Sequence, residues 1–256
     1  MESRSKRWLI AAALLGVGAA VEAAAVTLYW TPCAGQLIYG GIAGVEGDSS
    51  DFSPACFIAM DQAVPFALPQ PGEGWTLVGA LAALAGLLLA AAWLVVAWIP
   101  TATWKARVLL ASPGLLAAAT VGCSVVLAVT PAANVGVLGV LALATEGAVL
   151  VAWLTLGAIG VEGWLFFRYA VVALAATSTG MVHQFTELLL ATAMSEADWD
   201  APPGTGYLTV WFCLVAALLT VALWWRQSWG LTSGATSSPP AAGAPTPRAA
   251  RKIATT

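Results

Sequence analysis

Long runs of apolar residues, separated by short polar connections, dominate the chain. Six runs reach the roughly 20 residues that a helix needs to cross the hydrocarbon core of a bilayer. No segment shows the alternating polarity of a membrane β-barrel strand. The pattern therefore predicts an all-α bundle of six transmembrane helices, at residues 8–30, 75–99, 108–129, 135–157, 169–191 and 207–225.

Neither Pro113 nor Pro131 interrupts the centre of a predicted span. Pro113 is expected near the start of the third helix, and Pro131 in a tight turn between the third and the fourth. A proline at a span centre would interrupt the helix, as in transporters built on discontinuous helices. The placement of both prolines favours continuous spans.

The charged residues are segregated by these six spans. All ten lysines and arginines fall on one side of the membrane, and that side is cytoplasmic by the positive-inside rule. The sequence therefore predicts a multi-pass cell-membrane protein with both termini cytoplasmic. The basic residues are Arg4, Lys6, Arg7, Lys105, Arg107, Arg168, Arg226, Arg248, Arg251 and Lys252; the acids on the opposite side are Glu46, Asp48, Asp51, Asp61, Glu73, Glu196, Asp198 and Asp200.

Composition agrees with lipid as the main environment. Hydrophobic residues make up 60% of the 256 residues and charged residues only 9%, whereas a soluble domain carries about 25% charged residues. No basic patch is interleaved with aromatic residues, so a nucleic-acid partner is not expected. The expected partners are the lipid bilayer and other membrane protein subunits.

Tryptophans gather at the ends of the predicted spans. This is typical of aromatic belts, in which the rings anchor at headgroup depth, and it favours belts over a ligand cage. The expected inner belt holds Trp8, Trp98, Trp104, Trp164, Trp224, Trp225 and Trp229, and the outer belt Trp30, Trp75, Trp199 and Trp211.

The first apolar run imitates a secretory signal peptide, with basic residues ahead of it and small residues near its end. The run continues to Trp30 and includes Glu22, so it is longer than the usual apolar region of about 7–15 residues. An uncleaved first span is expected.

Two segments outside the spans are distinctive. The outer loop at 31–74 contains Cys33 and Cys56, and two cysteines on the oxidising side of a membrane usually pair. A disulfide closing this loop would stabilise the fold by roughly 3 kcal/mol. Residues 230–256 are rich in Gly, Ser, Thr, Pro and Ala, which predicts a disordered cytoplasmic tail after a six-helix domain at 1–229.

The candidate site consists of four ionisable residues inside predicted spans: Glu22, Glu146, His183 and Glu187. His183 and Glu187 are four residues apart, so they share one helix face. Glu22 lies roughly 21 Å past Trp8, a depth similar to that of His183. Ionisable groups are costly in hydrocarbon, so each should face the bundle interior. These residues predict a shared polar pocket of Glu22, His183 and Glu187, with Glu146 nearer the midplane.

Four interpretations of these polar residues remain open. They satisfy one another and fix helix register; they bind or relay a proton, an ion, a lipid or a small molecule; they hold a metal or haem; or they catalyse a reaction within the membrane. The single histidine argues against bis-histidine haem ligation. No catalytic motif is present, and no metal or cofactor is expected.

The sequence therefore predicts first a non-enzymatic accessory or scaffold subunit of a membrane protein complex. The alternatives are a small proton- or ion-coupled transporter that uses Glu22, Glu146, His183 and Glu187, and an enzyme that acts on a lipid-embedded substrate. The two cysteines in the spans, Cys123 and Cys213, are expected to be inert buried thiols.

Overall fold

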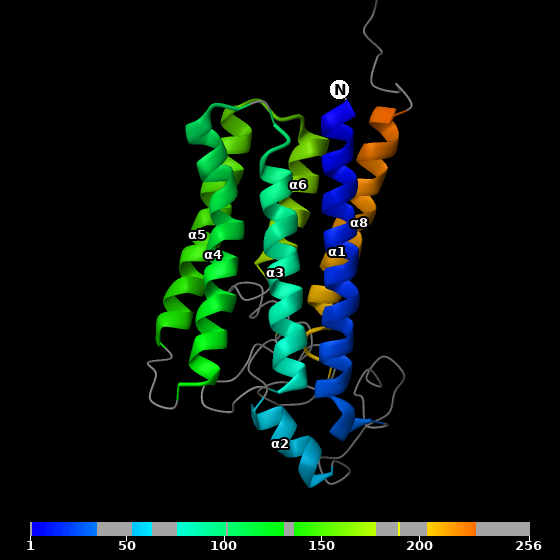
Figure 1. The fold of residues 1–256 in the computed structure, drawn as a ribbon, viewed down its shortest axis with the longest axis vertical. Helices are drawn as coiled ribbons and strands as arrows, with labels where there is room; N and C mark the ends of the chain where they lie inside the picture. Colours follow the sequence, from blue (N-terminus) through cyan, green and yellow to red (C-terminus); the bar gives the residue numbers. More distant parts are fainter. Residues whose placement is uncertain are drawn as a thin grey trace, which may run out of the picture.

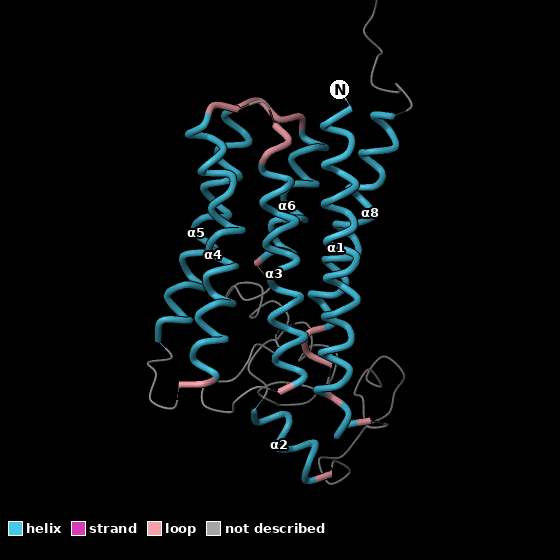
Figure 2. The backbone as a smooth tube through the Cα atoms, in the orientation of Figure 1, coloured by secondary structure: helices cyan, strands magenta, loops and turns pink. Residues whose placement is uncertain are grey.

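The computed structural model describes residues 2–34, 53–62, 76–100, 102–130, 136–177, 189 and 204–228. Over these residues the chain consists of helices joined by short turns, with no strand (Figure 2). The all-α prediction is therefore confirmed. His183, Glu187 and the tail at 230–256 lie outside the described residues.

Among the described residues, five helices are long and apolar enough to cross a membrane, in agreement with five of the six predicted spans. The other helices in this part of the chain are a shorter apolar helix, α6, and two short elements, one after α1 and one before α3. The span-length helices are α1 (Glu2–Tyr29), α3 (Leu77–Ala97), α4 (Trp104–Ala128), α5 (Gly136–Ala158) and α8 (Tyr207–Ser228); the others are η1 (Thr31–Cys33), α2 (Pro54–Gln62) and α6 (Gly163–Ala176).

The helix α6 differs from the predicted span at 169–191. It begins six residues earlier, at Gly163, and ends at Ala176 after 14 residues. The early start follows from a turn that closes α5: Gly160 has φ +72°, and backbone N–H groups of Val161 and Gly160 donate to the carbonyls of Leu156 and Gly157. This is the Schellman arrangement, in which glycine relieves the strain of the left-handed conformation. α6 therefore starts directly after a tight hairpin.

The helix α4 also begins earlier than predicted, at Trp104, because the Thr103 hydroxyl accepts a hydrogen bond from the Ala106 N–H and caps the helix. As a result Pro113 lies inside α4 and not near its start. Proline has no N–H to donate to the carbonyl four residues earlier. The Ser112 hydroxyl donates to that carbonyl, on Leu109, at 2.8 Å, and so the helix continues.

The bundle core is formed mainly by α1, α3, α6 and α8. α1 packs chiefly against α3 and α8, α4 against α3 and α5, and α6 contacts α3, α4, α5 and α8. Large aromatic side chains fill the centre: the ring centroid of Tyr169 lies 5.9 Å from that of Trp8 and 6.5 Å from that of Trp93. Small residues let the helices approach. A Cβ on Gly114 of α4, for example, would lie 2.9 Å from the carbonyl oxygen of Ala90 in α3.

The burial of Trp8 and Trp30 corrects their assignment to the aromatic belts. Trp8 is only 1% exposed in the bundle core, and Trp30 is 4% exposed in a cluster with Cys33 and Cys56. Their position at the end of an apolar run does not reveal which way the side chain points. Five other tryptophans assigned to the belts are exposed, as anchoring rings should be: Trp98, Trp104, Trp164, Trp211 and Trp225.

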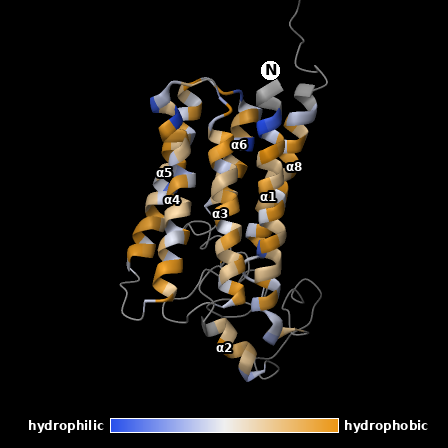
Figure 3. Cartoon of the chain, in the orientation of Figure 1, coloured by the Kyte–Doolittle hydropathy of each residue, from blue (hydrophilic) through white to orange (hydrophobic). Residues whose placement is uncertain are grey.

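The helices alternate in direction, so the start of α1 and the end of α8 lie at the same end of the bundle (Figure 1). The α3–α4 and α5–α6 connections lie there too, and hydrophilic positions gather at this end above an apolar middle (Figure 3). Lys6 and Arg7 lie near the start of α1, and Lys105 and Arg107 near the start of α4. We call this the basic end. Its assignment to the cytoplasm remains a topological prediction.

Candidate functional site

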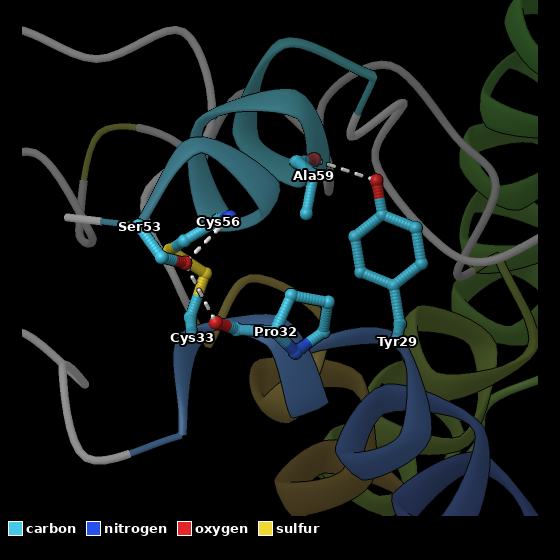
Figure 4. Close-up of a disulfide and its surroundings, with 6 residues drawn as sticks. All are labelled: Tyr29, Pro32, Cys33, Ser53, Cys56 and Ala59. Atoms are coloured by element: carbon cyan, nitrogen blue, oxygen red, sulfur yellow. Dashed lines mark hydrogen bonds between the residues drawn. A yellow bond between two sulfur atoms is a disulfide. The ribbon is translucent and has the colours of Figure 1, made fainter.

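The end opposite the basic end carries a small cap built around a disulfide (Figure 4). Cys33, in η1, is bonded to Cys56, in α2, with their Cα atoms 4.8 Å apart. The predicted disulfide is therefore confirmed. Both cysteines are fully buried, in a cluster with Val26, Trp30, Ala59 and Met60. We call this cluster the disulfide cap.

Hydrogen bonds join the disulfide cap to the bundle. The Tyr29 hydroxyl donates to the Ala59 carbonyl at 2.7 Å, as Figure 4 shows. The Trp30 indole N–H donates to the Thr205 carbonyl at 2.8 Å, just before α8. The hydroxyls of Thr27 and Tyr207 share a further hydrogen bond at 2.8 Å. These bonds tie α2 to the end of α1 and the start of α8.

A tight approach between α1 and the start of α8 completes the cap. Gly206 has φ +107°, and a Cβ at this position would lie 2.6 Å from Cγ2 of Val26. A residue with a side chain would be strained by the backbone and blocked by α1. Gly206 is therefore required both by its positive φ and by its close contact with Val26.

The predicted site residue Glu22 is buried in α1, with only 4% of its surface exposed. It lies close enough to the Cys213 thiol, in α8, for the two side chains to interact electrostatically. Gly18, one turn earlier, lets α1 approach α3, because its Cβ would lie 3.2 Å from Cδ2 of Leu89. Glu22 thus faces the bundle, as its cost in hydrocarbon requires. A carboxylate in this position can hold a proton or a cation.

Glu146 lies in a different part of the bundle, on α5, where it is half-buried. α5 packs against α4 and α6, whereas α1 packs chiefly against α3 and α8, so Glu22 and Glu146 belong to different helix interfaces. On the face of Glu146, Ala142 is buried, but a Cβ on Gly139 would meet no atom within 4 Å. The described residues therefore give Gly139 no role in close helix packing.

His183 and Glu187 both lie outside the described residues. The shared pocket of Glu22, His183 and Glu187 therefore stays a prediction.

The structure shows a buried cation at a position that the predicted spans leave between the fourth and the fifth. Arg168 lies within α6 and is only 3% exposed. Its guanidinium carbon lies 4.8 Å from the centre of the Trp164 ring, one turn earlier in the helix. Such cation–π contacts stabilise a guanidinium that has left water. The sequence does contain a sign of this arrangement. Trp164 and Arg168 are four residues apart in an otherwise apolar segment, so a helix that continues past Arg168 would bring the two side chains together.

Most of the buried hydroxyls bond to their own helices. Such local bonds satisfy the hydroxyl donor without a partner helix. The interior therefore contains polar groups that need neither water nor ligand to donate their protons. The hydroxyl groups that donate to carbonyls three or four residues earlier are those of Thr120, Thr145, Thr177 and Thr220.

The helix α6 ends inside the bundle. Its 14 residues span about 21 Å at 1.5 Å per residue, which is less than the roughly 30 Å of a hydrocarbon core. The capping residue, Thr177, is 3% exposed and its N–H donates to the carbonyls of Ala173 and Leu174. A helix C-terminus carries partial negative charge and so favours a nearby cation.

No metal centre is indicated by the described residues, among which no three His, Cys, Asp or Glu side chains gather in one place. Comparison with known proteins finds no match to a protein-family model, a curated protein or a solved structure.

Proposed function

We propose that this protein is an accessory or scaffold subunit of a membrane protein complex, spanning the cell membrane with both termini in the cytoplasm. The observation that carries the proposal is the outer face of α5. Only 22% of the α5 span is buried within the chain, compared with 56% of α3. The α5 outer face consists of Gly139, Leu143, Gly147, Leu150, Leu154 and Gly157, all of them exposed.

The glycines of the α5 outer face support a protein partner over lipid alone. Glycine within a helix costs up to about 1 kcal/mol relative to alanine. Gly114 offsets this cost by allowing contact with α3, but a Cβ on Gly139, Gly147 or Gly157 would meet no atom within 4 Å. Small residues on an exposed membrane helix are suited to close packing against another helix. A partner subunit with a transmembrane helix fits this face.

The filled interior also favours a scaffold. Trp8 and Trp93 are almost fully buried between the helices, and four buried threonines bond within their own helices. The disulfide cap fixes the opposite end. A bundle with a packed core and an exposed face that carries glycines on α5 is suited to holding partner subunits in place.

The test is purification of the full chain from native membranes in a mild detergent, by a tag at Thr256. We expect one integral membrane protein to co-purify at a fixed stoichiometry. Replacement of Gly147 by leucine, on the α5 outer face, should release it. The matched control is Gly122→Leu on α4, because Gly122 is also exposed and its Cβ would also meet no atom within 4 Å.

The outcomes separate the proposal from its alternatives. Loss of the partner in the Gly147 variant but not in the Gly122 variant supports a subunit that docks through α5. A monomer without co-purifying protein, identical for the wild type and both variants, would contradict the proposal. Thermal unfolding of each variant checks that the bundle itself is intact.

A second function is favoured by Glu22. This carboxylate is 4% exposed, and α6 ends inside the bundle at the buried Thr177, where the helix C-terminus carries partial negative charge. Both features suit a proton- or cation-binding site in a small coupled transporter. If Glu22 has this role, Glu22→Gln should abolish transport in proteoliposomes while the protein still folds. Unchanged transport would exclude Glu22 as the coupling residue.

A further inference from the structure

The basic end of the bundle brings two guanidinium groups to one tryptophan. Arg7 of α1 donates a hydrogen bond from Nη1 to the Trp98 carbonyl at 2.7 Å. Arg107 of α4 lies over the indole ring of the same residue, with its Cζ 5.3 Å from the ring centre. Trp98 is the residue that caps the C-terminus of α3. Three helices therefore meet at this pair of arginines.

The arginine pair lacks an anionic partner in the part of the chain that the structure describes. The contact of each guanidinium there is a carbonyl or a ring, neither of which carries a full negative charge. The Nε atom of Arg107 is buried and has no hydrogen-bond partner among the described residues. Two like charges held at one residue repel each other. An anion bound between them would relieve that repulsion.

The surroundings of the pair lie at the boundary between apolar and polar surface. The apolar helix α3 ends at Ala97, and Trp98 and Trp104 expose 50% and 71% of their surfaces beside it. Exposed tryptophans at the ends of apolar helices lie at the depth of lipid headgroups. Arg7 and Arg107 are both half-buried, so each keeps part of its surface accessible at this depth.

We propose that Arg7, Arg107 and Trp98 form a binding site for the phosphate of an anionic phospholipid. Guanidinium groups bind phosphate oxygens through paired hydrogen bonds. The Trp98 ring orients Arg107, and the Trp98 carbonyl orients Arg7, so both groups are held before the lipid arrives. The phospholipid then joins the starts of α1 and α4 to the end of α3. This site is independent of the α5 outer face and of any partner subunit.

The competing explanation is that the two arginines act only within the protein. Arg7 would then cap the carbonyl end of α3, and Arg107 would contribute a cation–π contact. Both explanations predict some loss of stability when an arginine is replaced. They differ in whether the protein selects an anionic lipid, so lipid selectivity is the quantity to measure.

The experiment is native mass spectrometry of the full chain, titrated with phosphatidylglycerol and, separately, with phosphatidylcholine. The ratio of the two dissociation constants gives the selectivity. The variants are Arg7→Gln and Arg107→Gln. The matched control is Lys105→Gln, which removes the same charge from the exposed start of α4 two residues before Arg107. Thermal unfolding and the intact disulfide confirm that each variant is folded.

We expect the wild type to select phosphatidylglycerol and each arginine variant to lower the selectivity about fivefold, the effect of one basic residue near an anionic surface. Lys105→Gln should lower it less than twofold. Equal losses in Arg107→Gln and Lys105→Gln, or no selectivity in the wild type, would overturn the proposal. If Arg7→Gln fails to fold, the comparison of Arg107→Gln with Lys105→Gln decides the question alone.

A second arm distinguishes a lipid from free phosphate. Inorganic phosphate is added at the same concentration as phosphatidylglycerol. Binding of the lipid should be unchanged, because the acyl chains hold the headgroup at the membrane boundary. Displacement of the lipid by inorganic phosphate would overturn the assignment to a phospholipid.

Discussion

Replacement of Gly114 by alanine tests the close packing of α3 and α4. A Cβ at this position would lie 2.8 Å from Cδ1 of Trp93, 2.9 Å from the carbonyl oxygen of Ala90 and 3.1 Å from Cγ of Leu94. The carbonyl oxygen is part of the α3 backbone and cannot rotate away as a side chain can. The Trp93 ring is fully buried against Tyr169. The two helices must therefore move apart to admit one methyl group.

Two opposing effects determine how much Gly114→Ala changes the free energy of unfolding. Overpacking of a well-packed core costs about 1–3 kcal/mol, while alanine is a better helix former than glycine by up to about 1 kcal/mol. We expect Gly114→Ala to lower the free energy of unfolding by about 1–2 kcal/mol. In Gly122→Ala, on the same helix, the new Cβ meets no atom within 4 Å, so only the helix-forming gain remains. That variant should be as stable as the wild type or more stable.

The assay is thermal unfolding of both variants in the same detergent, followed by helical circular dichroism. We expect the Tm of Gly114→Ala to fall by a few degrees below that of the wild type and that of Gly122→Ala not to fall. A Gly114→Ala protein at least as stable as Gly122→Ala would refute the described approach of α3 and α4.

Three further predictions concern the disulfide and the topology. In unreduced, denatured protein, an alkylating reagent should modify only Cys123 and Cys213, and after reduction it should modify all four cysteines. Modification of all four cysteines without reduction would contradict the Cys33–Cys56 bond. Removing this bond, whose cysteines are 23 residues apart in the sequence, should cost about 3 kcal/mol of stability, measured as a lower Tm of the Cys33→Ser, Cys56→Ser double variant. Reporter fusions at Thr256 and within residues 47–50 should lie on opposite sides of the membrane, because the chain crosses it an odd number of times between them; the same side for both would contradict the six-span topology.

The helices and the disulfide could be predicted because each follows from a strong local rule. An apolar run of about 20 residues forms a helix in a bilayer, where every backbone group must bond within its own segment. Cys33 and Cys56 could be paired because the charge pattern placed both in one outer loop. Neither inference needs knowledge of how the helices pack.

The packing itself could not be predicted, because helices that are apolar on all sides do not reveal which face points inward. Trp8 and Trp98 both lie at the ends of apolar runs, yet Trp8 is buried and Trp98 is half-exposed. The predicted spans leave Arg168 between the fourth and the fifth, whereas it lies in α6, 3% exposed, with its guanidinium against the ring of Trp164. The meeting of Arg7 and Arg107 at Trp98 depends on three helices far apart in the sequence. In the candidate site, the sequence predicts that Glu22 faces the bundle interior, because an ionisable side chain is costly in lipid. Its proximity to Cys213 depends on how α1 packs against α8 and therefore follows only from the structure.

Site-specific photocrosslinking in native membranes tests most directly whether α5 docks a partner subunit. A photoreactive amino acid at Leu154, on the α5 outer face, is compared with one at Leu218 on α8; the two leucines are 75% and 69% exposed, so both reach the surroundings equally well. A scaffold that docks through α5 predicts a single discrete protein adduct from position 154 and lipid adducts from position 218. Lipid adducts alone from both positions would contradict the claim that α5 binds a partner.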